Sequence, residues 1–458
     1  MGNDNRSSEI ARELRDEILG MSAGTRLLGV RELAARFHAS AATVSDALAE
    51  LSARGLVRAE PGRGTFVIGR DHGARPDYSW QSQALGAVRV DADRASRLGA
   101  HGGPGQIPLS WGYLADELQP GESLRRTGAR VARSAQGWEP TSPAGSADLR
   151  RLMAVEYHAQ PEDVQIVSGG QQALVFSFRT LAEPGETIVM ESPTYPGAIL
   201  AAQSAGLRIA AVPADAEGIR TDLLADELER TRARLVYLQP AYANPTGVVM
   251  SEQRRRDVLA LAVARGAFIV EDDWARHLGI ERSAPPPLFT EDVDGHVVSI
   301  TTLAKPVSPG LRIGAIIARG PAGARLRASR IADDLGVSPL MQEIAREFLA
   351  SSEWPRHRKR LRTALGDRRD ALLAAIAASD DLHVPFSPHG GLHIWVRLPD
   401  GADPAVVAAA AQTAGVLVGD GSHYFVDESP APFVRLSFGA ASPPQMVEGV
   451  RRLEGVLT

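Results

Sequence analysis

The sequence predicts two domains of different class. The first is a small helical domain closed by a two-stranded hairpin, and the second is a larger α/β domain with a mostly parallel sheet and a smaller α+β part at its C-terminal end. At 458 residues the chain is too long for one ordinary domain. A loosely patterned, glycine-rich stretch separates a helix-rich start from a long series of alternating apolar strands and helices. We therefore expect domains at 1–69 and 107–458, a linker at 70–106, and a division of the larger domain near residue 325.

The N-terminal segment has the element order of a winged helix. Apolar residues at helical spacing predict helices over about 7–20, 30–37 and 41–54, the last two joined by a short turn. Alternating strands then flank the turn Pro61-Gly62-Arg63-Gly64. A helix-turn-helix followed by a two-stranded wing is typical of proteins that bind double-stranded DNA, so we expect DNA as a partner of this segment.

Four short motifs follow predicted strands of the larger domain. In parallel α/β sheets, ligands bind beyond the carboxyl ends of the strands. The motifs are Ser168-Gly169-Gly170-Gln171, Ala243-Asn244-Pro245-Thr246-Gly247, Glu271-Asp272-Asp273-Trp274, and the group Thr302, Lys305 and Arg312. Taken singly, each can be an ordinary turn or helix cap. Together they predict one site, in which the glycine turn opens a helix whose free N–H groups can hold a phosphate.

The amino-acid composition excludes several kinds of site. The chain has no cysteine, which excludes disulfides, thiolate metal sites and cysteine nucleophiles, and we expect no metal. A net charge of −5 gives no general attraction to DNA, so DNA contact has to come from one module. The N-terminus lacks the pattern of a signal peptide, and the most apolar stretch is shorter than the roughly 20 residues that span a bilayer. We expect a cytoplasmic protein without membrane contact.

The chain has only two lysines among 50 basic Lys and Arg residues. Lys359 lies in the run Arg356-His357-Arg358-Lys359-Arg360, which is typical of a solvated charged face. Lys305 instead lies in an apolar neighbourhood. A lysine amine can form a Schiff base and an arginine cannot, which is a chemical reason for a lysine at position 305.

On these residues, the chain from about 108 to its end resembles the fold-type-I, pyridoxal-5'-phosphate-dependent aminotransferases of class I/II. The whole chain resembles the MocR-type regulators of the GntR family, which fuse a winged-helix head to such a domain. The resemblance implies pyridoxal 5'-phosphate (PLP) as cofactor, an amino acid or related amine as effector or substrate, and a homodimer. It also implies that Lys305 bonds to the cofactor aldehyde.

The resemblance assigns further roles to matching residues. Asp272 would face the pyridine nitrogen, Asn244 the phenolic oxygen, and Tyr195 would stack on the ring, although without its motif Tyr195 is equally a core aromatic. The substrate carboxylate would meet Arg435. The phosphate would be held by Gly170, Gln171, Thr302 and Arg312. Trp274 stands where the family has a tyrosine that also faces the cofactor.

In the head, five residues match or neighbour the DNA-contacting positions of the family: Arg31, Thr43, Ser45, Arg63 and Thr65. Gly29 and Ala41 depart from the pattern, and Ala41 replaces an arginine contact. Three functions remain open at this stage. The chain is a regulator that senses PLP or an amino compound, a working aminotransferase with a vestigial head, or an aminotransferase-like protein whose head serves assembly alone.

Overall fold

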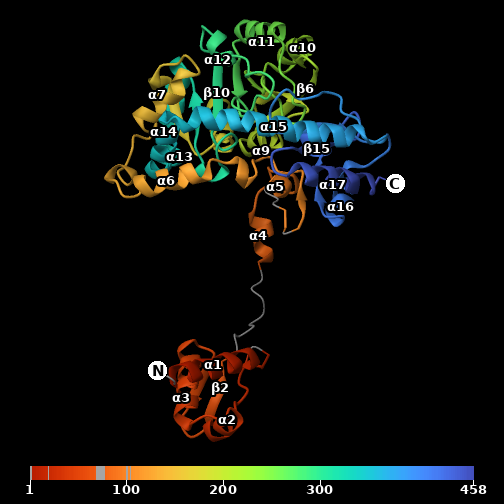
Figure 1. Ribbon diagram of the computed structural model, residues 1–458. Helices are drawn as coiled ribbons and strands as arrows, with labels where there is room; N and C mark the ends of the chain where they lie inside the picture. The colour runs from red at the N-terminus through yellow and green to blue at the C-terminus, as the bar shows by residue number, and fades with distance from the viewer. Residues whose placement is uncertain (1–2, 19, 69–77, 99–101, 104, 458) are drawn as a thin grey trace. The chain divides into compact units, whose positions relative to one another are not determined.

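The computed structural model describes residues 3–18, 20–68, 78–98, 102–103 and 105–457 (Figure 1). It divides into two compact units, Met1–Ala87 and Val88–Thr458. Within the described residues, no helix is long and apolar enough to cross a membrane.

The first unit has the predicted winged-helix order. Its elements are α1 (Asn3–Ile18), α2 (Val30–Arg36), α3 (Ala41–Ala53), β1 (Val57–Glu60), β2 (Gly64–Val67) and α4 (Ser79–Ala84). Strands β1 and β2 pair antiparallel as the wing. Apolar side chains such as Leu14, Val44 and Leu51 are at most 1% exposed and form its core. The predicted winged helix-turn-helix is confirmed by this arrangement.

An eight-stranded sheet organises the second unit, in the order β4-β11-β10-β9-β8-β5-β6-β7. Only β11 and β7 run antiparallel to their neighbours. The strands are β4 (Val164–Val167), β5 (Thr187–Ser192), β6 (Arg208–Asp215), β7 (Gly218–Ile219), β8 (Leu235–Leu238), β9 (Phe268–Asp272), β10 (Val297–Thr302) and β11 (Gly314–Ile317). The prediction of a mostly parallel sheet is therefore confirmed.

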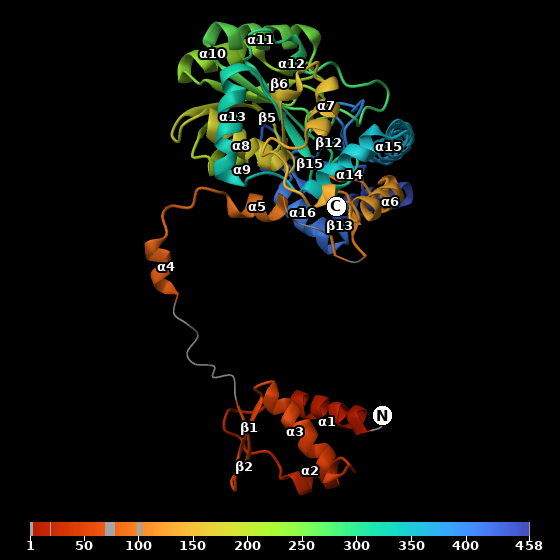
Figure 2. The same cartoon turned by 90° about the vertical axis from the view of Figure 1, so that its left-hand side faces the viewer.

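Helices cover both faces of this sheet (Figure 2). Successive strand residues point to opposite faces, so Val189 joins one buried cluster while Ile188 and Met190 join the other. One face packs against α8 (Gly170–Leu181), α9 (Pro196–Ser204) and α13 (Gly320–Asp333). The other packs against α7 (Ala147–Val155), α10 (Thr221–Thr231), α11 (Glu252–Arg265), α12 (Leu288–Glu291) and α14 (Pro339–Ala350). A further helix, α6 (Gly121–Val131), contacts α14.

The smaller part contains a three-stranded antiparallel sheet in the order β12-β15-β14. Its strands and helices are β12 (His393–Arg397), β14 (Gly419–Asp420), β15 (Phe433–Ser437), α15 (Glu353–Ala377), α16 (Pro404–Thr413) and α17 (Pro443–Glu454). A separate parallel pair joins β3 (Ile107–Pro108) to β13 (Val416–Leu417). Short 3-10 helices complete the unit at η1 (Asp116–Leu118), η2 (Ala135–Gly137), η3 (Pro161–Asp163), η4 (Pro309–Leu311) and η5 (Gly421–Tyr424).

The structure differs from the expected boundaries in two places. The segment expected as linker contains α4 and also α5 (Ala92–Leu98). Helix α5 packs against α9, and the backbone N–H of Asp91 donates to Gln203 at 3.2 Å. Residues Ile107, Leu109 and Leu114 belong to the core of the smaller part rather than the larger. In both cases the packing partners lie far away in the sequence, where local composition carries no signal.

Candidate active site

All ten cofactor and substrate residues predicted in the larger domain line one cavity of about 370 Å³. They are Gly170, Gln171, Tyr195, Asn244, Asp272, Trp274, Thr302, Lys305, Arg312 and Arg435. Their convergence follows from topology. Strands β4, β10, β9, β8 and β5 run parallel in one sheet, so the residues after their carboxyl ends meet at one edge. Arg435 is the exception, because it reaches the cavity from β15 of the smaller sheet.

Lys305 is partly buried, and its amine contacts the segment that precedes the sheet. Its Nζ donates to the carbonyl of Gly112 at 2.8 Å and lies 3.6 Å from the ring centroid of Tyr113. Burial lowers the pKa of Lys305 to about 7, and Arg435 lowers it too, while the charge of Asp272 acts in the opposite direction. A large fraction of this amine is therefore neutral, and nucleophilic, near neutral pH.

The other lysine lies elsewhere. Lys359 is exposed on α15 and borders a separate groove of about 430 Å³ together with Arg358 and Arg362. None of the ten residues of the first cavity lines this groove, which is larger but carries no strand-end motif.

Asp272 is 4% exposed at the end of β9, and two donors hold its Oδ2. Tyr237 donates its hydroxyl at 2.8 Å and Gln239 its side-chain amide at 2.9 Å. Burial raises the pKa of Asp272 to about 6, against the effect of these hydrogen bonds. The next residue, Asp273, instead accepts from Tyr157 at 2.7 Å and from Arg276, and does not line the cavity.

The start of α8 forms a polar cradle on another wall. Gly169 precedes the helix at φ +94°, and a Cβ there would lie 2.9 Å from Nη2 of Arg312. Glycine at 169 thus permits the close approach of the guanidinium, which donates to the carbonyl of Ser168 at 2.8 Å. The first N–H groups of α8, at Gly170 and Gln171, have no partner within the helix because they open it. Helix-end N–H groups beside an arginine make a site for a phosphate.

Asn244 and Arg435 are joined to each other. Both are buried, at 7% and 8% exposed, and Nη1 of Arg435 donates to Oδ1 of Asn244 at 3.1 Å. Nη2 of Arg435 donates to the carbonyl of Ser110 at 2.6 Å, while its Nε has no partner among the described residues. The Asn244 amide nitrogen is therefore left to face the cavity.

Tyr195 directly precedes α9, and its hydroxyl donates to Oε1 of Gln171 at 3.1 Å. The amide nitrogen of Gln171 donates in turn to the carbonyl of Gly197 at 2.7 Å. Gln171 thus orients the tyrosine ring with its side chain. Thr302 uses its hydroxyl to accept from the N–H of Ala304 at 3.1 Å.

Sequence reasoning missed His393, which stacks on Trp274 with ring centroids 5.6 Å apart. The histidine is 3% exposed and lies 3.4 Å from Nη1 of Arg435 through Nε2. Burial, and then the charges of Arg435 and Lys305, hold the pKa of His393 well below its usual value, so it is neutral. Nothing marks His393 in the sequence, because it reaches the cavity from β12 of the smaller part.

Several polar atoms of the residues around the cavity lack a hydrogen-bond partner. Nε1 of Trp274, Nδ1 of His393 and Nε of Arg435 are buried polar atoms without a hydrogen-bond partner among the described residues, and all three side chains line the cavity. Such atoms are costly unless a ligand or water satisfies them. The amine, the carboxylate and the phosphate cradle that share this cavity fit PLP.

The head residues do not all match their predicted roles. Arg31, Ser45 and Arg63 are exposed, on α2, on α3 and at the tip of the wing, and Thr65 is partly exposed on β2. Arg63 pairs with Glu60 at 2.8 Å.

The position of Thr43 differs from that expected of a DNA contact. Its side chain is 3% exposed, and its hydroxyl lies 2.8 Å from that of Ser40, which caps α3 by accepting from the Thr43 N–H at 3.1 Å. Thr43 therefore helps to stabilise the start of α3, and its buried side chain does not match the exposure expected of a base contact.

Comparisons with known proteins match both units. The family described as Aminotransferase class I and II matches residues 105–453, and the family of Bacterial regulatory proteins, gntR family, matches residues 6–67. Over 447 residues, 94% of this chain and 91% of its relative, the protein is 29% identical to the HTH-type transcriptional regulator YdfD of Bacillus subtilis strain 168. It is 31% identical to the 2-aminoadipate transaminase of Thermus thermophilus, covering 76% of this chain and 89% of that enzyme.

The crystal structure of LysN, an alpha-aminoadipate aminotransferase from Thermus thermophilus complexed with N-(5'-phosphopyridoxyl)-L-leucine, has the same fold. It superposes with a TM-score of 0.77 at 30% identity, covering 82% of this chain and 98% of LysN. The class implies PLP as the cofactor. With a class I and II aminotransferase domain behind a gntR-family winged helix, and a regulator relative that matches over nearly its whole length, the chain belongs to the MocR-type regulators of the GntR family.

Proposed function

We propose that this regulator binds DNA through its winged helix and changes its DNA binding when an amino compound occupies the PLP-containing cavity of its second unit. One observation carries the proposal. A chain with a helix-turn-helix also brings Lys305, Asp272 and Arg435 into one cavity, which unites an amine, a buried carboxylate and a buried guanidinium beside a phosphate cradle.

PLP supplies an aldehyde that reacts with amines and a ring that withdraws electrons when its nitrogen is protonated. Lys305 would hold the aldehyde end, and Asp272 the ring nitrogen. The amide of Asn244 is free to donate to the phenolic oxygen, and Tyr195, oriented by Gln171, can cover the ring. The N–H groups of Gly170 and Gln171, with Arg312 and Thr302, would hold the phosphate.

The residues around Lys305 prepare the site for an amine. Because burial lowers the pKa of the free Lys305 amine to about 7, much of it is unprotonated near neutral pH and would react with the cofactor aldehyde. Arg435, which lines the cavity, would pair with the carboxylate of the amino compound. Trp274 and neutral His393 stack on each other along this wall and add no charge beside the guanidinium.

On the DNA side, Arg31, Ser45, Arg63 and Thr65 remain exposed enough to contact a duplex. We assign Arg63 to a phosphate or the minor groove, since it stands at the wing tip, and Ser45 to the major groove on α3. We further propose that the protein is a homodimer, as the resemblance implies, and that it acts in the cytoplasm on chromosomal DNA.

The test is a gel shift of the full chain on a duplex from its own upstream region and on a random duplex of equal length. We expect preference for the upstream duplex, and an effect of PLP with amino acids on that preference. Lys305→Ala is the matched control, and its DNA binding should not respond to amino acids. If the protein bound both duplexes equally, with and without PLP and amino acids, the regulatory function would be wrong. The head would then serve assembly only.

A second candidate function, transamination, is favoured by the completeness of the site. A sensor needs a binding cavity alone, yet Lys305, Asp272, Asn244 and Arg435 are all present, and the amine of Lys305 has the lowered pKa of a catalytic base. Rapid mixing of the holoprotein first with an amino acid and then with a 2-oxo acid distinguishes transamination from sensing. Repeated turnover supports the enzyme, whereas a spectral change without release of a 2-oxo acid rules it out.

A further inference from the structure

Gln239 is a buried residue of the cavity wall to which the proposed function gives no role. It directly follows β8 and is 3% exposed. Its amide nitrogen donates to Oδ2 of Asp272 at 2.9 Å, and its amide oxygen accepts from the backbone N–H of Asn244 at 2.9 Å. One side chain therefore holds both the carboxylate proposed for the ring nitrogen and the turn whose amide is proposed for the phenolic oxygen.

The backbone of Gln239 is itself fixed by a buried acid. Its N–H donates to Oε1 of Glu191, which is 2% exposed on the neighbouring strand β5, at 2.8 Å. Burial raises the pKa of Glu191 to about 8 against the effect of this hydrogen bond, and the charge of Asp272 raises it too. A largely protonated Glu191 holds the backbone of Gln239 without placing a second negative charge beside Asp272.

Gln239 is one of two donors that favour the charged form of Asp272. The other is the hydroxyl of Tyr237, which donates to the same oxygen at 2.8 Å. Burial raises the pKa of Asp272 to about 6, and the two hydrogen bonds oppose this rise because they stabilise the carboxylate. A protonated ring nitrogen needs the charged form as its partner. Loss of the Gln239 donor would therefore raise the pKa of Asp272 further and weaken that partner near neutral pH.

Gln239 also connects Asp272 to the residues on the other side of the cofactor. Of the two donors to Asp272, Gln239 alone is hydrogen-bonded to Asn244 in the part of the chain that the structure describes. The side chain of Asn244 accepts in turn from Arg435 at 3.1 Å. A continuous series of hydrogen bonds thus runs from the proposed partner of the ring nitrogen to the proposed partner of the substrate carboxylate.

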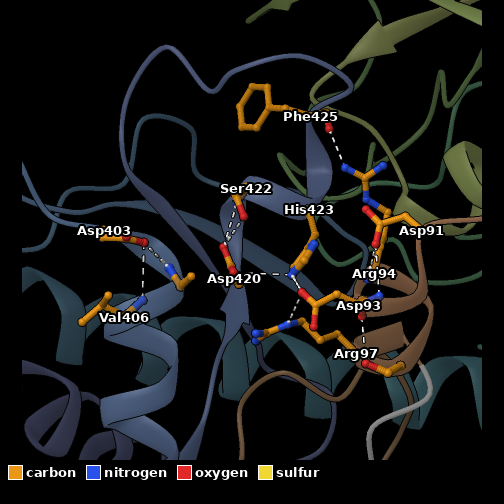
Figure 3. Close-up of polar contacts among 12 residues, drawn as sticks. Asp91, Asp93, Arg94, Arg97, Asp403, Val406, Asp420, Ser422, His423 and Phe425 are labelled. Carbon is orange, nitrogen blue, oxygen red and sulfur yellow. Dashed lines mark hydrogen bonds and ion pairs between the residues drawn. The ribbon is translucent and has the colours of Figure 1, made fainter.

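A second carboxylate lines the cavity, but it is engaged elsewhere. Asp420 accepts from the N–H and the hydroxyl of Ser422 at 2.9 and 2.7 Å, and it lies 3.4 Å from His423 (Figure 3). It caps η5 in the smaller part of the unit. Among the described lining residues, Asp272 is therefore the carboxylate left for the ring nitrogen, and Gln239 contacts that one.

We infer that Gln239 is a positioning residue for the cofactor, which keeps Asp272 charged toward the ring nitrogen and holds the Asn244 turn in place for the phenolic oxygen. This inference rests on the proposed function, in which PLP occupies the cavity. Gln239 acts through Asp272 and Asn244 and carries out no proton transfer of its own.

The test measures, by titration of cofactor absorbance, how tightly the full-length cofactor-free protein binds PLP and an analogue with carbon in place of the ring nitrogen. The ratio of the two affinities reports the contact with Asp272. We expect the parent to prefer PLP, and Gln239→Met, which removes both hydrogen bonds, to reduce this preference by about tenfold. Gln165→Met is the matched control, since Gln165 is 2% exposed in the same sheet and does not line the cavity.

Two further measurements separate positioning from general support of the fold. The preference for PLP should decline at low pH as Asp272 takes up a proton, and Gln239→Met should move this decline to higher pH because the pKa of Asp272 rises. Gln239→Met should also reduce the preference for PLP over an analogue without the phenolic oxygen. Tyr237→Phe removes a donor to Asp272 alone, so it should lower the ring-nitrogen preference and leave the phenolic one unchanged.

If Gln239→Met does not fold, Gln239→Asn gives the same measurements, because its amide is one methylene too short to reach both partners. A variant that binds PLP and both analogues more weakly to the same degree, or that keeps both preferences, overturns the inference. Failure of the proposed function is a different result, namely DNA binding that no amino acid alters. If that result came with the expected loss of preference in Gln239→Met, the positioning role would stand and the regulatory function would not.

Discussion

Lys305 owes its reactivity to its surroundings rather than to its residue type. Lys359 is exposed to solvent, whereas Lys305 shares a cavity with Arg435 and Arg312. Two like charges and desolvation outweigh the single favourable charge of Asp272, so the amine loses its proton readily.

Borohydride reduction of the holoprotein should therefore fix one cofactor per chain on Lys305, as detected by peptide mass spectrometry. Lys305→Ala should carry no covalent cofactor, and Lys359→Ala should be labelled like the parent. A label on Lys359, or on neither lysine, would show that the site assignment is wrong.

Asp272→Ala should weaken PLP binding by more than about tenfold, because the ring nitrogen would lose the buried carboxylate that we propose as its partner. Titration of cofactor absorbance measures the affinity. Asp273→Asn is the control and should bind PLP like the parent, since Asp273 faces Tyr157 and Arg276. If Asp273→Asn weakened PLP binding and Asp272→Ala did not, Asp273 rather than Asp272 would be the partner of the ring nitrogen.

Capture of PLP by the cofactor-free protein should depend on pH through Lys305. Because its pKa is lowered to about 7, the amine is protonated and unreactive below this value, and the capture rate should rise as the pH increases through about 7. Asp272 raises the pKa of this amine, so Asp272→Asn should move the midpoint to lower pH. Stopped-flow absorbance gives the profile, and a midpoint near the ordinary lysine pKa of about 10.4 would contradict the assignment.

At the scale of elements, α3 and the wing each carry a candidate DNA contact of the head. Ser40 and Thr43 stabilise the start of α3. Of the two residues of α3 predicted to contact DNA, Thr43 and Ser45, only Ser45 is exposed. The wing presents Arg63, whose only ion-pair partner in the described chain is Glu60 at 2.8 Å. An exposed pair of this kind contributes little to stability and is easily exchanged for a phosphate.

Arg63→Ala should weaken DNA binding nearly evenly across sequences and reduce the salt slope by about one, as the loss of a single phosphate contact does. Binding isotherms at several salt concentrations, on the upstream duplex and on a random duplex, measure both quantities. Arg15→Ala, on the exposed side of α1, is the control. Loss of affinity on the upstream duplex alone would instead make Arg63 a base contact.

At the scale of the whole molecule, light scattering of the holoprotein at micromolar concentration should give the mass of two 48.8 kDa chains. Two heads in one dimer would bind paired half-sites more tightly than one head alone. We expect this gain to offset the affinity lost where Ala41 stands in place of the family's arginine contact. A monomer that still holds its cofactor would contradict the proposed dimer.

Much of the site could be predicted because its residues follow strands. Gly170, Asn244, Asp272 and Lys305 lie in recognisable motifs, and parallel strands bring their carboxyl ends to one edge of the sheet whatever the details of packing. The winged helix could be predicted for a similar reason, since the periodicity of its helices and the turn of its wing are local properties of the sequence.

By itself, the sequence therefore determined the order of the two domains, the sheet and its helices, and the strand-end residues of the cavity. The tertiary structure decided which distant side chains complete that cavity, namely His393 from β12, Tyr113 from the segment before the sheet and Arg94 from α5. It also buried Thr43, which the sequence left as a DNA contact. The physical reason is that local patterns encode local backbone structure, whereas burial and contacts between remote segments arise only when the whole chain packs.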